Sequence, residues 1–151
     1  MKRHEGCASL TVTAVLVLFA VACGGRAADS GPVTAQQPVT GIDWRVDGLT
    51  AGGVARRAPA AAHLRIGEDG GAVGNLGCNW FSARGTVHGD RITFGDLRTT
   101  RMACDRDRMD FERALAHTLT AGTLTARTHD AELTLTGDDG DRIQLRRSTA
   151  E

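Results

Sequence analysis

The chain has 151 residues, of which 41% are hydrophobic, and its 18 basic side chains balance 18 acidic ones. This length allows a single domain with one core. A balanced charge gives no net attraction to nucleic acid or to an anionic surface, so we expect no nucleic-acid partner.

An export signal is predicted at the start of the chain. Lys2 and Arg3 precede an uncharged run over 8–22 that is rich in Val, Leu and Ala. The run is too short for a transmembrane helix, which needs about 20 apolar residues, and it is typical of the apolar part of a signal peptide. We therefore interpret residues 1–22 as a signal peptide.

The run ends in Ala-Val-Ala-Cys-Gly at 20–24, which resembles a bacterial lipobox. The resemblance implies that the Cys23 thiol receives a diacylglyceryl group and that a peptidase cuts just before it. The pattern prefers Leu where this chain has Ala20. An ordinary secretory cut near Ala22 or Ala28 and an uncleaved membrane anchor remain alternatives.

Residues 24–40 are small, polar and proline-containing, without a period, which predicts a flexible tether. We expect residues 23–40 to be lipid anchor and tether, and residues 41–147 to be one domain. The expected location is the outer face of the cell membrane, with the N-terminal lipid as the membrane contact and the protein as a monomer.

Cys78 and Cys104 are the cysteines of this domain. In an exported protein two cysteines favour one disulfide, with two buried free thiols as the alternative. Neither has a Cys or His at zinc-ligand spacing, so no metal site is expected.

The domain reads mostly as β structure. Alternation of apolar and polar residues predicts seven or eight strands, within 41–49, 62–66, 72–81, 84–87, 91–94, 123–128, 132–136 and 142–146. Glycines 74 and 77 predict a bulge or bend inside the strand over 72–81. Turns are expected at 68–71, 88–90 and 137–141, a loop at 52–62, and an irregular connection over 97–104.

One helix is predicted over about 107–119, because Phe111, Leu115 and Leu119 form an apolar stripe and Asp105 or Asp107 can cap it. The expected fold is mainly β (α+β): an antiparallel sheet curled toward a barrel, with the helix packed on it or closing one end.

These residues resemble the META domain, also called the HslJ-like domain. The resemblance rests on Trp44, the blocks GNLGCNWF (74–81), ITFG (92–95), TTRMAC (99–104) and LTL (133–135), and on Glu112 and Leu115 of the helix. It covers about 41–147. It implies a compact β-rich domain in secreted or lipid-anchored envelope proteins, a loose association with stress tolerance and, in some members, antibiotic resistance. It implies no established catalytic residues.

Catalytic signatures are not found in the sequence. It has no HExxH, G-x-S-x-G or phosphate-binding loop, so we expect no enzyme, no catalytic residue and no cofactor. The acidic run over 105–110 begins like a calcium loop, but Asp110 stands where such a loop needs Gly. A helix cap explains this run better. Residues 137–141 are interpreted as a plain turn, with weak calcium binding as the alternative.

Asn79 and Arg101 are the polar residues that we single out. A structural role is favoured for both, with Asn79 satisfying backbone groups at a bend and Arg101 doing the same or pairing with an acid. The functional alternative is a shallow polar binding site around the disulfide. We expect an envelope lipoprotein that binds a protein or a cell-wall component; the alternative is a carrier with a small ligand inside the curled sheet.

Overall fold

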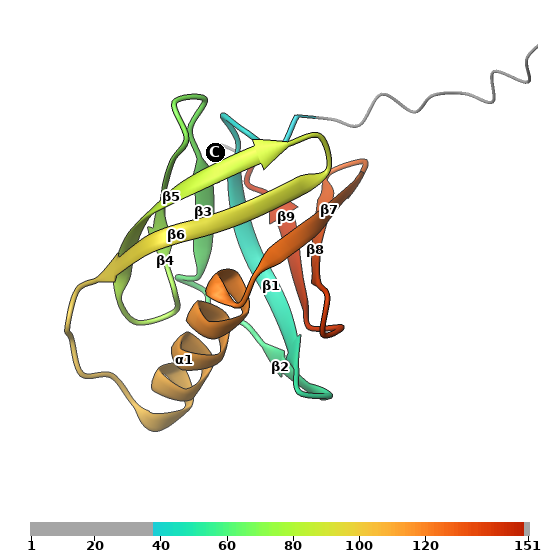
Figure 1. Cartoon of the computed structure of the whole chain (residues 1–151). Helices are drawn as coiled ribbons and strands as arrows, with labels where there is room; N and C mark the ends of the chain where they lie inside the picture. Colours follow the sequence, from blue (N-terminus) through green and yellow to red (C-terminus); the bar gives the residue numbers. More distant parts are fainter. Residues whose placement is uncertain (1–37, 150–151) are drawn as a thin grey trace, which may run out of the picture. The chain divides into compact units, whose positions relative to one another are not determined.

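The computed structural model describes residues 38–149, which form an antiparallel barrel with one helix (Figure 1). Helix α1 (Arg106–Thr120) separates β6 from β7. The strands are β1 (Asp43–Ala51), β2 (Val54–Arg57), β3 (His63–Ile66), β4 (Gly71–Asn75), β5 (Trp80–His88), β6 (Arg91–Thr99), β7 (Thr123–His129), β8 (Glu132–Gly137) and β9 (Arg142–Arg147). The mainly β fold with one helix is confirmed.

Eight of these strands close into a ring. The strands follow one another in the sheet in chain order from β3 to β9, and β1 pairs with β3 on one side and β9 on the other. The short β2 lies outside the ring, paired with the second half of β1. Closure leaves the eight ring strands without a continuous open edge, so the barrel offers little template for edge-to-edge association.

The inside of the barrel is filled by alternate side chains of the strands. Trp44, Leu64, Phe94 and Leu135 are each no more than 6% exposed and belong to one apolar cluster. The Trp44 indole nitrogen donates to the Val39 carbonyl oxygen at 2.9 Å, which ties the residues before β1 to the core. Burying each such side chain stabilises the fold by about 1.5–3 kcal/mol.

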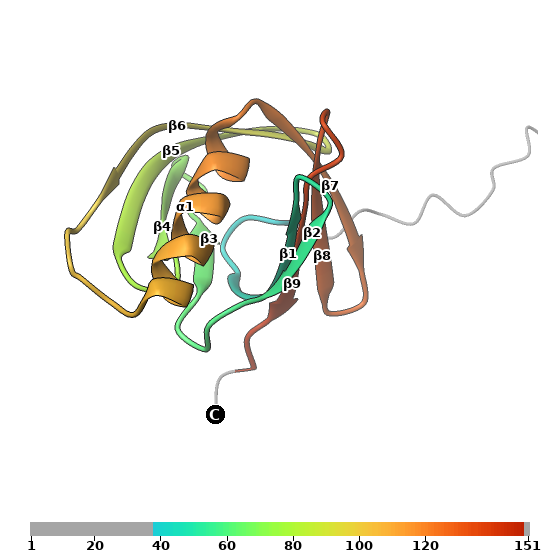
Figure 2. The same ribbon diagram turned by 90° about the horizontal axis from the view of Figure 1, so that it is seen from below.

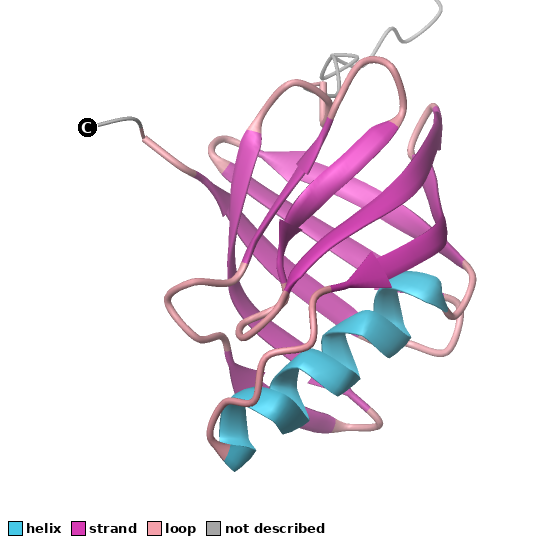
Figure 3. Ribbon diagram, turned by 90° about the vertical axis from the view of Figure 1, so that its left-hand side faces the viewer, coloured by secondary structure: helices cyan, strands magenta, loops and turns pink. Residues whose placement is uncertain are grey.

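Helix α1 lies across one end of the barrel, as the view from below and the side view show (Figures 2 and 3). Its apolar stripe of Phe111, Leu115 and Leu119 is 2–3% exposed and joins the barrel core. The predicted helix is thereby confirmed, one residue longer at each end, and it closes this end of the barrel.

The helix begins at the predicted cap. The Asp105 carboxylate accepts the Arg108 backbone N–H at 3.0 Å and its guanidinium Nε at 2.8 Å. The side-chain hydrogen bond from Arg108 is the main reason that the pKa of Asp105 lies below its ordinary value. The acidic run over 105–110 therefore serves helix initiation, as interpreted from the sequence.

Three strand predictions were wrong. Residues 54–57, expected in a loop, form β2, which shows no alternation of buried and exposed residues and ends in two consecutive arginines. The predicted strand over 72–81 is two antiparallel strands, β4 and β5, joined by a tight turn in which Gly77 has φ +113°. Finally, the strand predicted to end at residue 94 continues as β6 to Thr99, into the segment expected to be an irregular connection. The register of β6 against β5 shifts at a bulge between the pairs Arg84–Gly95 and Ser82–Arg98.

Within residues 38–149, no helix combines the length and apolar character needed to cross a membrane. The predicted signal peptide, Cys23 and most of the tether lie outside the described residues.

Candidate functional site

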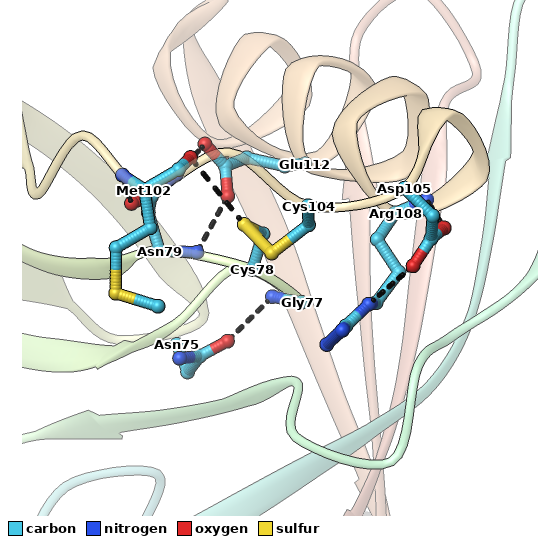
Figure 4. Close-up of polar contacts among 9 residues, drawn as sticks. All are labelled: Asn75, Gly77, Cys78, Asn79, Met102, Cys104, Asp105, Arg108 and Glu112. Carbon is cyan, nitrogen blue, oxygen red and sulfur yellow. Dashed lines mark hydrogen bonds and ion pairs between the residues drawn. A yellow bond between two sulfur atoms is a disulfide. The ribbon is translucent and has the colours of Figure 1, made fainter.

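A disulfide joins the β4–β5 turn to the segment that follows β6. Cys78 and Cys104 are bonded, with 6.1 Å between their Cα atoms and 26 positions between them in sequence (Figure 4). The predicted pairing is thus present. Closing a loop of this length stabilises the folded chain by about 3.5 kcal/mol in the chain-entropy account.

Asn79, next to this disulfide, is the centre of a hydrogen-bonded cluster. Its Oδ1 accepts the Met102 backbone N–H at 2.6 Å and the Thr100 hydroxyl at 2.9 Å. Its Nδ2 donates to the Met102 carbonyl oxygen at 3.2 Å and to Glu112 Oε1 at 2.9 Å. Every side-chain donor and acceptor of this 2% exposed residue is therefore engaged within the protein.

Glu112 connects this cluster to the helix. Besides the bond from the Asn79 side chain, its Oε2 accepts the Asn79 backbone N–H at 2.7 Å. We call Asn79, Thr100, Met102 and Glu112 the Asn79 cluster. Bonds to a carboxylate are about twice as strong as neutral ones, so the cluster holds turn, post-β6 segment and helix together next to the disulfide.

The structure separates the two polar residues that the sequence singled out. Asn79 has the structural role expected for it, but it satisfies backbone groups of Met102 in the segment after β6, while Asn75 Oδ1 accepts the Gly77 N–H at the bend. Arg101 is exposed and makes no hydrogen bond or ion pair within residues 38–149, so it has neither of the expected partners.

Beside the Asn79 cluster, apolar side chains are exposed on the outer surface of the barrel. Trp80 is 56% exposed, Met102 54% and Val73 51%. Val73 and Trp80 are diagonal neighbours on adjacent strands, since Val73 pairs with Ser82. The Trp80 and His63 rings meet edge to face at 5.3 Å. We call this surface the Trp80 face; it consists of His63, Val73, Trp80, Ser82 and Arg98. The exposed Arg101 and Met102 come directly after Thr100, whose backbone N–H donates to the Trp80 carbonyl oxygen at 3.0 Å.

Charge on the Trp80 face is positive. Arg98 is the register partner of Ser82 and, like Arg101, makes no ion pair among the described residues. A cleft of about 410 Å³ is lined by Ser82 and Arg98, by further residues of β5 and β6 and by the β3–β4 turn, and it includes the carboxylates of Asp69 and Asp96. The face thus combines an exposed indole with the Arg98 guanidinium, which makes no ion pair with either carboxylate.

The helix end of the barrel carries a second polar feature, at Asp141. Its carboxylate accepts the Gly52 N–H at 2.8 Å and the Thr118 hydroxyl at 3.2 Å. The turn over 137–141 is therefore used to fasten the β8–β9 connection to the helix and to the β1–β2 turn. Among residues 38–149, no three His, Cys, Asp or Glu side chains are grouped to hold a metal ion.

Sequence reasoning missed Glu112 as the partner of Asn79 and Trp80 as a surface residue. The signal for Trp80 was available, because adjacent residues of a strand face opposite sides and Phe81 had to occupy the core. No sequence signal could have found the Asn79–Glu112 contact, which joins residues 33 positions apart.

Comparisons with known proteins agree with this architecture. The family model of the META domain matches residues 37–150. An NMR structure of a protein from Burkholderia xenovorans is similar, with a TM-score of 0.63 and 26% identity, over 74% of this chain and 85% of that one. A second NMR structure has a TM-score of 0.55 at 18% identity, over 70% of this chain and 87% of its own. A search of curated proteins finds no match.

Those solved chains are matched over most of their own length, so each consists largely of this fold. We expect residues 37–150, which the META family model matches, to fold in the same way as an isolated domain.

Proposed function

The chain belongs to the META domain family, and on that basis we propose that it is a non-enzymatic binding module of the cell envelope that contacts a protein partner through the Trp80 face. The observation that carries the proposal is the exposure of Trp80 directly beside a rigid support. Its neighbour Asn79 is fixed by the hydrogen bonds of the Asn79 cluster and by the adjacent disulfide. A large indole on a rigid strand binds with little loss of conformational freedom.

The composition of the Trp80 face supports a protein partner. Trp and Arg are enriched in protein interfaces and dominate their binding energy. The unpaired Arg98 and Arg101 favour an acidic surface on the partner. A second copy of this chain fits poorly, because it would place arginines of the same face against each other.

The absence of catalysis is part of the proposal and is supported by how the polar groups beside the disulfide are used. The side chains of Asn79, Thr100 and Glu112 bond to one another and to the Met102 backbone, which is a structural use of these groups. In the described residues no buried side-chain nitrogen or oxygen lacks a partner.

The small-ligand carrier is the weaker alternative. The side chains that would line its cavity, Trp44, Leu64, Phe94 and Leu135, are packed in the core. None of them lines the four clefts described for this surface, which all include exposed residues.

Anchoring at the outer face of the cell membrane completes the proposal. It rests on the lipobox-like segment ending at Cys23 and on the tether, which together lie before the described domain. We expect Cys23→Ala to release the protein from the membrane fraction. A variant that stays membrane-bound would contradict lipidation.

The test of the proposed role is complementation of a deletion strain under heat, oxidant and envelope-active drugs. Val73→Ala and Val54→Ala are a matched pair, since the two side chains are 51% and 52% exposed but only Val73 lies on the Trp80 face. We expect Trp80→Ala, and more weakly Val73→Ala, to fail to complement, while Val54→Ala restores the parent. A deletion strain that equals its parent under every stress would remove the stress role.

A further inference from the structure

A cleft on the outer surface at β1 and β9 is lined by arginines. It has a volume of about 540 Å³. Strand β9 is four strands from β5 through β6, β7 and β8, and β1 is three strands from β5 through β4 and β3. We call it the arginine cleft; it is lined by Arg45, Asp47, Arg57 and Arg146, with Val46 and residues 58–60.

The guanidinium groups are brought together by strand pairing. Arg45 on β1 and Arg146 on β9 are direct register partners, so two like charges face the same side of adjacent strands. Such a pair destabilises a sheet unless negative charge lies between them. Asp47 supplies that charge, with Oδ1 at 3.3 Å from Arg45 and Oδ2 at 3.3 Å from Arg146.

One carboxylate does not balance this site. Arg57 is the register partner of Gly48, beside Asp47, and makes no hydrogen bond or ion pair within residues 38–149. The cleft therefore holds three guanidinium groups and one carboxylate. Glu132 on β8, the register partner of Arg146, adds a second carboxylate 3.6 Å from Arg146 Nη2, so one positive charge remains in excess.

Asp47 also orients the arginines. Asp47 Oδ1 accepts from both Nε and Nη2 of Arg45, and Asp47 Oδ2 lies 3.3 Å from Arg146 Nε. The Nη1 groups of both arginines remain available, because the other contact of Arg146, to Glu132, is made by Nη2. Planar guanidinium groups fixed in this way suit an anion with several oxygens, such as a phosphate. A smaller cleft of about 260 Å³ adjoins at Asp47 and Arg146 and is lined by Thr134 and Gln144, which can bond hydroxyl groups.

We propose that the arginine cleft binds the phosphate group of a phosphorylated polyol, with Arg57 and Arg146 as its main contacts. The cleft borders the Trp80 face, because Arg45 is the register partner of His63. Arg57 and Arg146 do not belong to the Trp80 face, so this proposal does not depend on the proposed protein partner. Glycerol phosphate has the required chemistry, and it occurs both as a free molecule and as the headgroup of an anionic phospholipid.

The test uses residues 37–150 in 150 mM NaCl, titrated with glycerol 3-phosphate while the arginine Nε–H signals are followed by NMR. In parallel, the same chain is floated with phosphatidylglycerol vesicles and with phosphatidylcholine vesicles. We expect saturable shifts of Arg57 and Arg146, or flotation that requires phosphatidylglycerol. The first outcome supports a free phosphate and the second a lipid headgroup.

Arg57→Gln is the diagnostic variant, because Arg57 has no partner to lose and its removal leaves the ion pairs of Asp47 intact. Arg127→Gln is the control, since it removes the same charge from β7. We expect Arg57→Gln to weaken binding about tenfold or more with an unchanged unfolding midpoint. Equal weakening by Arg127→Gln, or no binding in either arm, would overturn the proposal.

Discussion

Replacing Asn79 tests whether the cluster around it holds the fold together. Asn79→Ala removes four side-chain hydrogen bonds, three to neutral groups and one to the Glu112 carboxylate. At about 1 kcal/mol for a neutral bond and about 1.5–3 kcal/mol for the charged one, simple addition gives about 4.5–6 kcal/mol. Thr100 and Met102 are exposed, so water can take over some of the hydrogen bonds that they lose and reduce this sum. We expect a loss of about 3 kcal/mol in the free energy of unfolding.

Asn79→Asp sharpens the test because it preserves size and shape. It replaces the amide nitrogen by an oxygen that faces Glu112 Oε1, 2.9 Å away, and the Met102 carbonyl, 3.2 Å away. Two attractive contacts become repulsive, while the bonds accepted by Oδ1 can persist. At pH 7 we therefore expect Asn79→Asp to be at least as destabilising as Asn79→Ala.

Urea unfolding of residues 37–150 with the disulfide intact measures both variants. With a slope of about 1.5 kcal/mol per molar, a loss of 3 kcal/mol lowers the midpoint by about 2 M. Either variant unfolding within about 0.5 kcal/mol of the parent would refute the structural role assigned to Asn79.

Three further predictions concern the same domain. Replacing Cys78 and Cys104 together by Ala should lower the free energy of unfolding by about 3.5 kcal/mol, measured against the oxidised parent. An unchanged unfolding midpoint would contradict the stabilising role of the disulfide. Gly74→Ala should lower the free energy of unfolding by about 3 kcal/mol or more, because the added Cβ would overlap the β3 backbone and lie 2.8 Å from the Phe81 ring. Gly95→Ala is the control and should leave stability nearly unchanged, because its added Cβ would have no atom within 4 Å. Asp105→Asn keeps a helix cap but removes the charge. The pKa of Asp105 is lowered in the folded protein, so the charged carboxylate stabilises the parent at pH values above the ordinary pKa of 3.8. This advantage in free energy of unfolding over the variant should disappear as pH falls through the lower folded-state pKa. A difference in stability that persists at pH 2 would contradict this prediction.

Local patterns explain which parts of the fold could be predicted. The apolar stripe of α1, its cap at Asp105 and the hairpin turn between β5 and β6 each depend on a few consecutive residues, and each was found. The disulfide was predicted because an exported domain with two cysteines leaves one pairing. The META resemblance covered the domain that the family model matches.

Features that depend on distant contacts were missed. Strand β2 exists because β1 offers it a backbone partner, and no apolar period marks it. The Asn79 cluster needs the helix to bring Glu112 to the β4–β5 turn. Net charge near zero likewise concealed the local excess of arginines at the β1–β9 pair.

The most direct test of the account is photo-crosslinking in intact cells from a reactive residue placed at Ser82. Ser82 lies on the Trp80 face between Val73 and Arg98, while Arg127 on β7 is an exposed control position away from it. We predict a crosslinked envelope protein from position 82, none from position 127, and loss of the product with Trp80→Ala. The same products from both positions, or a product from position 82 that survives Trp80→Ala, would contradict the claim that this domain works through the Trp80 face.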